Sequence, residues 1–160
     1  MADATRVTVE RRIDAPADDI FAIVSDPNGH VQIDGSGMLV AAPDAKPLTA
    51  VGDTFDMNMD REPLGDFPEM GKYQVLNTVT RIEPGRLIEW NVGSAEHGPF
   101  GHVYGYELSP AGADATDVVH YCDWSDIPEN VRDAITWPVV PKHMLEQTLE
   151  KLDQVATGGA

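Results

Sequence analysis

Two groups of side chains in this sequence have the chemistry to move protons. The first group is His30 and Asp34, which stand four residues apart. On a helical turn they would share a face, where the histidine could act as a general base and the carboxylate could orient it. The same pair could instead cap a turn and bond the backbone of the Gly35-Ser36 segment, and we favour this structural role.

The second group lies in two strand-like segments farther along the chain. Tyr104 and Tyr106 alternate onto one face of residues 102–108, where their hydroxyls could supply protons inside a pocket. Asp123 would be a buried carboxylate with a raised pKa, and so a candidate acid, if it faces inward. Residues 116–125 do not define its side, because both alternating rows of that segment contain apolar residues.

The other reactive residue types show no spacing that is typical of a known site. The five histidines form no HxH or HExxH pattern, so we expect no metal. Cys122 is the only cysteine, and without basic neighbours we expect it to be a small buried residue in a reducing compartment. Phosphate-binding glycine loops and nucleophile elbows are absent from the sequence, and we expect no tightly bound cofactor.

The charge balance excludes several classes of partner. The chain has 27 acidic and 11 basic side chains, for a formal net charge of −16. Such a field repels nucleic-acid phosphates and anionic lipid surfaces. No stretch approaches the ~18 apolar residues of a membrane-spanning helix, and the first residues show no signal-peptide pattern. We therefore expect a cytoplasmic protein without nucleic acid or membrane insertion, in an oligomeric state that the sequence does not define.

The candidate residues must be positioned by 160 residues, which fit a single domain (1–160) with its core at about 5–156. An alternating apolar pattern predicts strands over 5–14, 38–42, 55–60, 73–82, 87–92, 102–108 and 116–125. Pro16 and the helical spacing of the following apolar residues predict a short helix, which the Asp26-Pro27-Asn28-Gly29 turn ends. We expect a loop over residues 93–101.

The last predicted element is a long helix. Leu145, Leu149, Leu152 and Val155 form an apolar stripe with helical spacing. Residues 127–136 can begin an earlier helix, but the prolines at 138 and 141 forbid one continuous helix through that point. Consecutive strands with short turns pair as an antiparallel meander. The predicted fold is therefore α+β, a curved sheet of six or seven strands around the C-terminal helix, with one or two short helices after the first strand.

A single helix does not fill a wide curved sheet, so we expect an apolar cavity between the two. Aromatic and sulfur-containing side chains of the sheet and helix are its expected wall: Met57, Met59, Trp90, Tyr104, Tyr106, Tyr121, Trp137 and Met144. Each of these could equally be part of an ordinary core. Residues 127–142 are the expected gate, because their prolines prevent regular helical hydrogen bonding.

Several stretches of the sequence resemble a known superfamily. Residues 9–16, VERRIDAP, followed by Ile20-Phe21 and Val24-Ser25-Asp26-Pro27, resemble the opening of START/Bet v 1-like (SRPBCC) proteins, in particular the bacterial polyketide cyclase/dehydrase and lipid-transport type. Residues 80–90, TRIEPGRLIEW, and the closing helix fit the same pattern. The resemblance covers nearly the whole chain and implies a helix-grip fold. The chain departs from many relatives at residues 30–34, HVQID, where those relatives carry a tryptophan.

The resemblance does not select one function, because this fold supports several. We favour the binding of a hydrophobic small molecule, which could be polyketide-like, aromatic or lipidic, by a carrier or sensor. One alternative is a polyketide cyclase or dehydratase in which Tyr104, Tyr106 or Asp123 donates protons. The other is a co-chaperone-like protein-interaction module that uses the outer face of the sheet.

Overall fold

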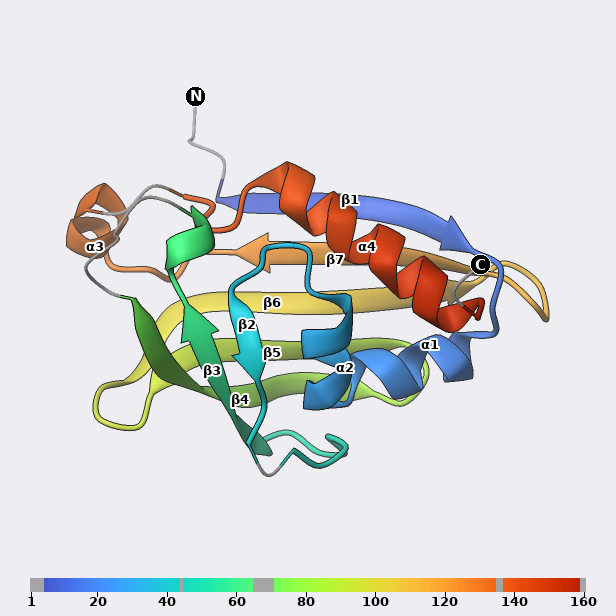
Figure 1. Ribbon diagram of the computed structural model, residues 1–160, viewed down its shortest axis with the longest axis horizontal. Helices are drawn as coiled ribbons and strands as arrows, with labels where there is room; N and C mark the ends of the chain where they lie inside the picture. The colour runs from blue at the N-terminus through green and yellow to red at the C-terminus, as the bar shows by residue number, and fades with distance from the viewer. Residues whose placement is uncertain (1–4, 44, 65–70, 135–136, 159–160) are drawn as a thin grey trace.

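The described residues form a seven-stranded antiparallel sheet with helices packed against its inner face (Figure 1). The computed structural model describes residues 5–43, 45–64, 71–134 and 137–158. The elements in chain order are β1 (Arg6–Ile13), α1 (Ala17–Val24), α2 (Pro27–Ile33), β2 (Leu39–Ala41), β3 (Thr54–Asp60), the 3₁₀ turn η1 (Glu62–Leu64), β4 (Lys72–Glu83), β5 (Leu87–Ser94), β6 (Gly98–Pro110), β7 (Thr116–Asp123), α3 (Glu129–Ala134) and α4 (Lys142–Ala156).

The strand order is β1-β7-β6-β5-β4-β3-β2, so all strands except β1 follow one another as a meander. The β4–β5 turn shows why: Gly85 adopts φ 76° and the Arg86 N–H donates to the Glu83 carbonyl at 2.9 Å. The first strand instead pairs with the last, with Arg6 opposite Asp123. The predicted α+β helix-grip architecture is confirmed.

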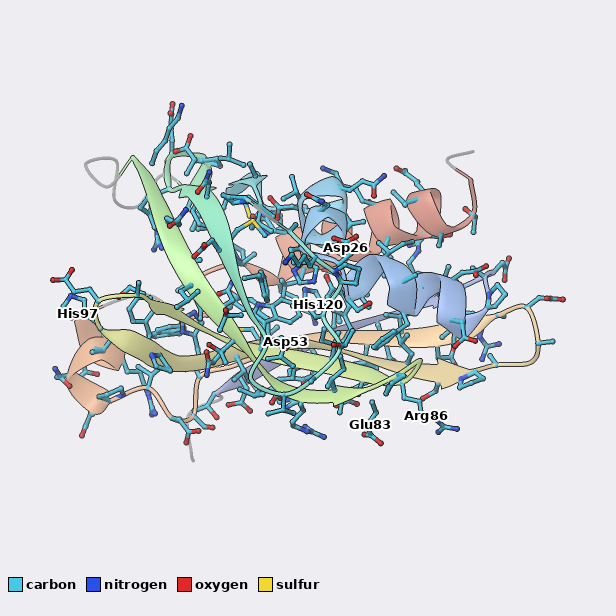
Figure 2. The ribbon with its side chains drawn as sticks, turned by 90° about the horizontal axis from the view of Figure 1, so that it is seen from below. Asp26, Asp53, Glu83, Arg86, His97 and His120 are labelled. Atoms are coloured by element: carbon cyan, nitrogen blue, oxygen red, sulfur yellow. The ribbon has the colours of Figure 1, made fainter. Side chains whose placement is uncertain are left out.

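The sheet bends strongly around the helices. In Figure 2, β3 and β4 run at a steep angle to the other long strands, and register shifts interrupt the β4–β5 and β5–β6 ladders. Such irregularities increase the local bend. The prediction of a loop over 93–101 was wrong, because β5 runs to Ser94, which pairs with Gly98. Gly93 makes this possible, since a Cβ there would lie 2.5 Å from the Gly98 carbonyl oxygen.

Two short helices follow β1, and the second begins where the sequence predicted only a turn. The Asp26 carboxylate accepts a hydrogen bond from the Asn28 N–H at 2.9 Å, and Pro27 occupies the first helical position. A capping acidic residue followed by proline is a strong helix start, so the turn that ends α1 also begins α2. This places His30 on α2, where it is buried.

The long helix α4 packs its predicted leucine stripe against the sheet. Leu145, Leu149 and Leu152 are buried, and each such side chain contributes roughly 1.5–3 kcal/mol of burial free energy. The loop after α2 lies directly on this helix: the Gly35 N–H donates to the Thr148 hydroxyl oxygen at 2.9 Å. A Cβ at Gly35 would lie 2.4 Å from the Met144 carbonyl oxygen, so glycine is required for this close approach.

A polar network on the outer face decides which row of β7 faces inward. The Tyr121 hydroxyl donates to Glu89 at 2.7 Å, and the Thr80 hydroxyl donates to the same carboxylate at 2.8 Å. The Tyr121 ring lies over the backbone of Gly105, where a Cβ would come within 2.5 Å of the ring. The Arg6 guanidinium carbon lies 4.0 Å from the centroid of the Tyr121 ring. With Tyr121 held outside, Val118, His120 and Cys122 point to the inner face.

The expected gate consists of α3 and the segment before α4. The helix predicted over 127–136 is present as α3, and residues 135 and 136 lie outside the described residues. Ile127 packs with Cys122 and Trp124, and Trp137 and Val131 contact this cluster. The segment therefore covers one end of the inner sheet face.

Candidate functional site

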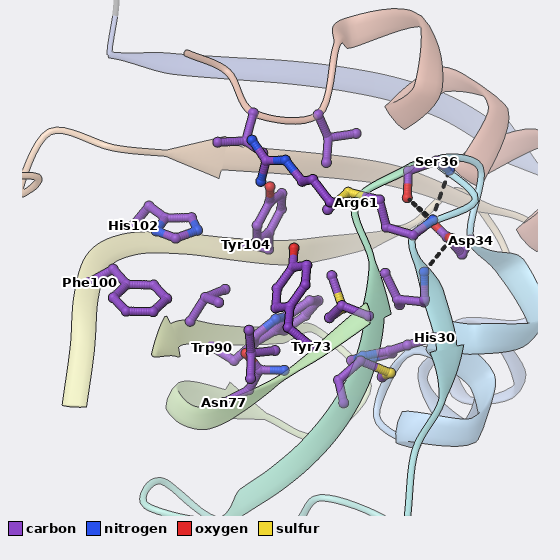
Figure 3. Close-up of a pocket in the computed structure, with 18 of the residues that line it drawn as sticks. His30, Asp34, Ser36, Arg61, Tyr73, Asn77, Trp90, Phe100, His102 and Tyr104 are labelled. Carbon is purple, nitrogen blue, oxygen red and sulfur yellow. Dashed lines mark hydrogen bonds between the residues drawn. The ribbon is translucent and has the colours of Figure 1, made fainter. Parts of the chain in front are cut away.

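A cavity of 780 Å³ lies between the inner face of the sheet and α4 (Figure 3). Small-molecule sites typically enclose roughly 300–1,000 Å³, so the space would hold a ligand of drug or lipid size. Most lining side chains are apolar or aromatic. They come mainly from β3 to β6, with others from α2, β2, β7, α3, residues 137–140 and α4. The alternation of β3, β5 and β6 explains this wall, because every second residue of a strand points to the same face.

Aromatic rings form a stacked array along one wall. The Trp90 ring lies 4.5 Å from the His30 ring and 6.0 Å from the Tyr106 ring, centroid to centroid. Tyr106 stacks on His120 at 4.1 Å with an interplanar angle of 8°. Trp90 is paired across strands with Tyr104, as Tyr106 is with His120, so the sheet register itself holds the rings together. The wall is consequently a pre-organised aromatic surface.

Two buried histidines of this wall each bond a backbone carbonyl. His30 Nε2 lies 2.6 Å from the Val24 carbonyl oxygen, and His120 Nδ1 lies 2.9 Å from the Gly105 carbonyl oxygen. Burial is the main reason that the pKa of each histidine falls from its ordinary value of 6.5 to about 4. Both imidazoles are therefore neutral at pH 7, with the proton on the nitrogen that donates to the carbonyl.

A third histidine lies toward the gate. Burial lowers the pKa of His102 to about 4, and its Nδ1 is buried without a hydrogen-bond partner. Its ring contacts Trp137 edge-on at 5.1 Å, and the indole Nε1 of Trp137 is also buried without a partner. The carbonyl oxygen of the Asn77 side chain on β4 is another such atom in a lining residue. The largely apolar wall thus also contains buried polar atoms that have no hydrogen-bond partner.

The tyrosine hydroxyls are held in their protonated form. Burial raises the pKa of Tyr104 well above its ordinary value, with a smaller contribution from Cys122, and burial likewise raises the pKa of Tyr106. In Figure 3 the guanidinium end of Arg61 lies beside the Tyr104 hydroxyl, and the charge of Arg61 opposes the rise. Burial also raises the pKa of the Cys122 thiol to about 12. These groups can donate hydrogen bonds but are poor bases and nucleophiles at pH 7.

Nearly the whole chain matches one known protein family. Residues 4–157 match the family described as Polyketide cyclase / dehydrase and lipid transport. The chain belongs to this family. The polyketide cyclase/dehydrase and lipid-transport resemblance predicted from the sequence is thereby confirmed.

A mycobacterial protein is similar to most of this chain. The chain is 33% identical over 119 residues to the uncharacterized protein Rv0088 of Mycobacterium tuberculosis, a match that covers 72% of this chain and 47% of that protein. It therefore spans about half the length of the curated relatives it matches.

Solved structures show the same fold at low sequence identity. Protein MLL2253 of Mesorhizobium loti superimposes with a TM-score of 0.65 at 20% identity, covering 97% of this chain and 98% of that chain. Protein Ms6760 of Mycobacterium smegmatis gives a TM-score of 0.68 at 14% identity, covering 98% of this chain and 93% of that chain. At these identities the likeness concerns the fold.

The cavity brings together six of the eight residues predicted to form its wall. These six are Met57, Met59, Trp90, Tyr104, Tyr106 and Trp137. Tyr121 lies on the outer face of the sheet, where its hydroxyl bonds Glu89. Met144 is half-buried on α4 and does not line the cavity, to which the neighbouring Leu145 contributes instead.

The proton-transfer candidates occupy different places. Asp123 faces outward: burial alone would raise its pKa, but hydrogen bonds from Ser125 and Arg6 outweigh this and hold the pKa below its ordinary value. The Asp34 carboxylate accepts hydrogen bonds from the Ser36 N–H at 2.9 Å and the Leu39 N–H at 3.1 Å. His30 bonds Val24 instead of Asp34. Asp34 therefore caps the turn at Ser36, as the favoured interpretation predicted, whereas His30 does not contact that turn, and both residues line the cavity.

Several lining residues were missed from the sequence. His120 was missed because both rows of residues 116–125 are apolar, and only the outer-face network shows which row points inward. Asn77 lies between the inward-facing Val75 and Val79, so strict alternation along β4 could have identified it. His102 lies two residues before Tyr104 on β6, so the alternation that places Tyr104 inward also identifies His102.

Two further classes of site have no support in the described part of the chain. Its histidine, cysteine, aspartate and glutamate side chains form no group of three or more that could hold a metal ion. Its helices are also too short or too polar to cross a bilayer.

Proposed function

We propose that this domain binds a hydrophobic small molecule inside the cavity, as a carrier or sensor. The observation that carries the proposal is a space of 780 Å³ whose wall is largely apolar and aromatic. Burying about 300 Å² of apolar ligand surface would contribute on the order of 7 kcal/mol before the costs of association. Without those costs, ~7 kcal/mol corresponds to a Kd of about 10 μM, so a ligand must bury more than about 300 Å² of apolar surface to bind with micromolar affinity.

The direct test uses 1,6-diphenylhexatriene, a neutral apolar dye that has no hydrogen-bond donor and fluoresces in apolar surroundings. A neutral dye avoids repulsion by the net charge of −16. We expect saturable binding with a micromolar Kd. Val92, which lines the cavity, provides a blocking variant, because Val92→Phe would occupy part of the space. Val51→Phe is the matched control, since Val51 is 63% exposed in the loop before β3.

The outcomes of this test are distinct. Weaker dye binding in Val92→Phe, with wild-type binding in Val51→Phe, supports the cavity as the binding site. Equal binding in both variants would place the dye elsewhere on the protein. If the wild-type protein does not bind the dye, the proposed binding function is refuted.

A second candidate is a cyclase or dehydratase, because Tyr104 and Tyr106 line the cavity and their hydroxyls could donate hydrogen bonds to a substrate oxygen. Asp123 is not part of this candidate, because its side chain lies on the opposite face of the sheet. If the tyrosines only form the wall, Tyr104→Phe and Tyr106→Phe should change dye affinity by no more than a few fold. A fall in turnover of a poly-β-keto substrate by about 10²–10⁴, with dye binding retained, would establish the enzyme instead.

The interaction-module alternative lacks a comparable observation. The large apolar side chains exposed among the described residues are Val40, Val51 and Phe100, which lie on β2, before β3 and on β6. A docking surface would need these to form one contiguous patch. We therefore do not propose this function.

A further inference from the structure

The cavity wall contains two histidine nitrogens with an unused capacity for hydrogen bonding. A carbonyl oxygen can only accept, so His30 donates from Nε2 and His120 donates from Nδ1. The second nitrogen of each neutral ring, Nδ1 of His30 and Nε2 of His120, then carries a lone pair. Among the described residues no hydrogen bond engages either nitrogen, and both side chains line the cavity.

Both rings are held firmly in place. His30 is 5% exposed and stacks on Trp90 at 4.5 Å, while His120 is 4% exposed and stacks on Tyr106 at 4.1 Å. Each ring is therefore fixed by a backbone hydrogen bond on one edge and by an aromatic face. Such pre-organisation means that little rotamer freedom would be lost when a ligand bonds the free nitrogen.

The chemistry of these atoms defines a complementary ligand. A neutral imidazole nitrogen with a lone pair accepts hydrogen bonds from hydroxyl or N–H groups and offers nothing to a ligand oxygen without a proton. A buried polar group left unpaired is costly, so a site that contains acceptors discriminates strongly against ligands without donors. His30 and His120 belong to one aromatic wall, because His30 stacks on Trp90 and His120 stacks on Tyr106, and the Trp90 and Tyr106 rings lie 6.0 Å apart.

We propose that the cavity selects apolar molecules that carry hydroxyl or N–H donors, and that His30 Nδ1 and His120 Nε2 accept the hydrogen bonds from them. This inference rests on the proposed binding function and specifies its ligand class. It distinguishes hydroxylated ring compounds from hydrocarbons, ethers and simple acyl chains of the same size.

The test compares two probes with one ring system, 2-naphthol and 2-methoxynaphthalene, as competitors of bound diphenylhexatriene. The ether is the more apolar of the two, so the hydrophobic effect alone would favour it. Because only the naphthol can donate to the imidazoles, we expect it to displace the dye at about 10-fold lower concentration. Equal displacement, or a preference for the ether, would overturn the inference while leaving the dye-binding function intact.

Variants then assign the preference to the two histidines. His30→Phe and His120→Phe keep a ring for stacking but remove the lone pair. Because 2-naphthol has one hydroxyl and bonds one imidazole at a time, its preference should fall in the variant that removes its acceptor and reach unity when both substitutions are combined. His143→Phe is the matched control, because His143 is exposed on α4 and should keep the full preference. A naphthol preference that survives in the double variant His30→Phe/His120→Phe would contradict the assignment.

A measurement on the wild-type protein covers the case in which these variants fail to fold. Nitrogen-15 spectra of the histidine rings distinguish the protonated nitrogen from the unprotonated one. Addition of 2-naphthol should shift the unprotonated nitrogen of at least one of His30 and His120, whereas 2-methoxynaphthalene should leave both in place. Binding of naphthol without such a shift would overturn the inference, and absence of binding by the dye itself would overturn both the inference and the proposed function.

Discussion

Acidification should destabilise the domain through its three buried histidines. Burial lowers the pKa of His30, His102 and His120 from 6.5 to about 4. Because the pKa in the folded state lies below that in the unfolded state, this stabilisation is fully present above pH 6.5 and is lost as the pH falls toward 4. The difference corresponds to about 3 kcal/mol for each histidine, so the three together approach the ~5–15 kcal/mol total stability of a typical domain.

The assay is urea unfolding followed by tryptophan fluorescence at several pH values. Near pH ~5 the unfolded chain binds about three more protons than the native state, so the free energy of unfolding should fall by about 4 kcal/mol per pH unit. The His120→Gln variant should reduce that slope by about one third, whereas His143→Gln, at an exposed site on α4, should retain it.

Carboxylates do not affect this comparison. They titrate equally in the wild type and the variant, so their contribution to the pH slope cancels in the difference. Asp53 and Asp117 have pKa values lowered by backbone N–H groups and by Arg12 respectively, and the stability they supply is lost below pH 3.8. A slope unchanged by His120→Gln would refute the assignment. If that variant does not fold, direct titration of the histidine ring protons in the wild type would refute it by showing a pKa near the ordinary value.

Three further predictions follow from other parts of the molecule. Gly105→Ala should lower the free energy of unfolding by about 1–3 kcal/mol, because the new Cβ would lie 2.5 Å from the Tyr121 ring; thermal melting measures this. Amides in 127–134 and 137–140 should exchange faster than those around Leu149, and equal protection would exclude these residues as a gate. With a net charge of −16, the protein should shift neither duplex DNA nor anionic vesicles at physiological salt, and a salt-sensitive mobility shift would contradict this expectation.

The elements of the fold were largely predictable because local patterns determine them. The leucine stripe of α4 and the alternation of β5 and β6 are properties of neighbouring residues, and both appear in the structure as predicted. The start of α2 was misread, since Asp26-Pro27 can end one helix and also begin another. The local pattern was sufficient for the type of element and insufficient for its exact bounds.

The side on which β7 presents each residue was not predictable from its own sequence. Val118, His120 and Cys122 compete with Val119 and Tyr121 for the inner face. The choice depends on contacts made by distant residues, since Glu89 bonds the Tyr121 hydroxyl and the bare backbone of Gly105 accommodates its ring. Such long-range pairs leave no periodic signal, which is why His120 and its free nitrogen were missed.

The pairing of β1 with β7 has a consequence for synthesis of the chain. Ile13 leaves the ribosome about 110 residues before its neighbours in β7 are complete, a delay of about 5–20 s at ordinary translation rates. During that time β1 is a nascent strand without its hydrogen-bonding partner, the state in which strands associate with other chains. The charged side chains of Glu10, Arg11 and Arg12 lie within this strand and oppose such association. They protect the nascent strand until the last strand arrives to close the sheet.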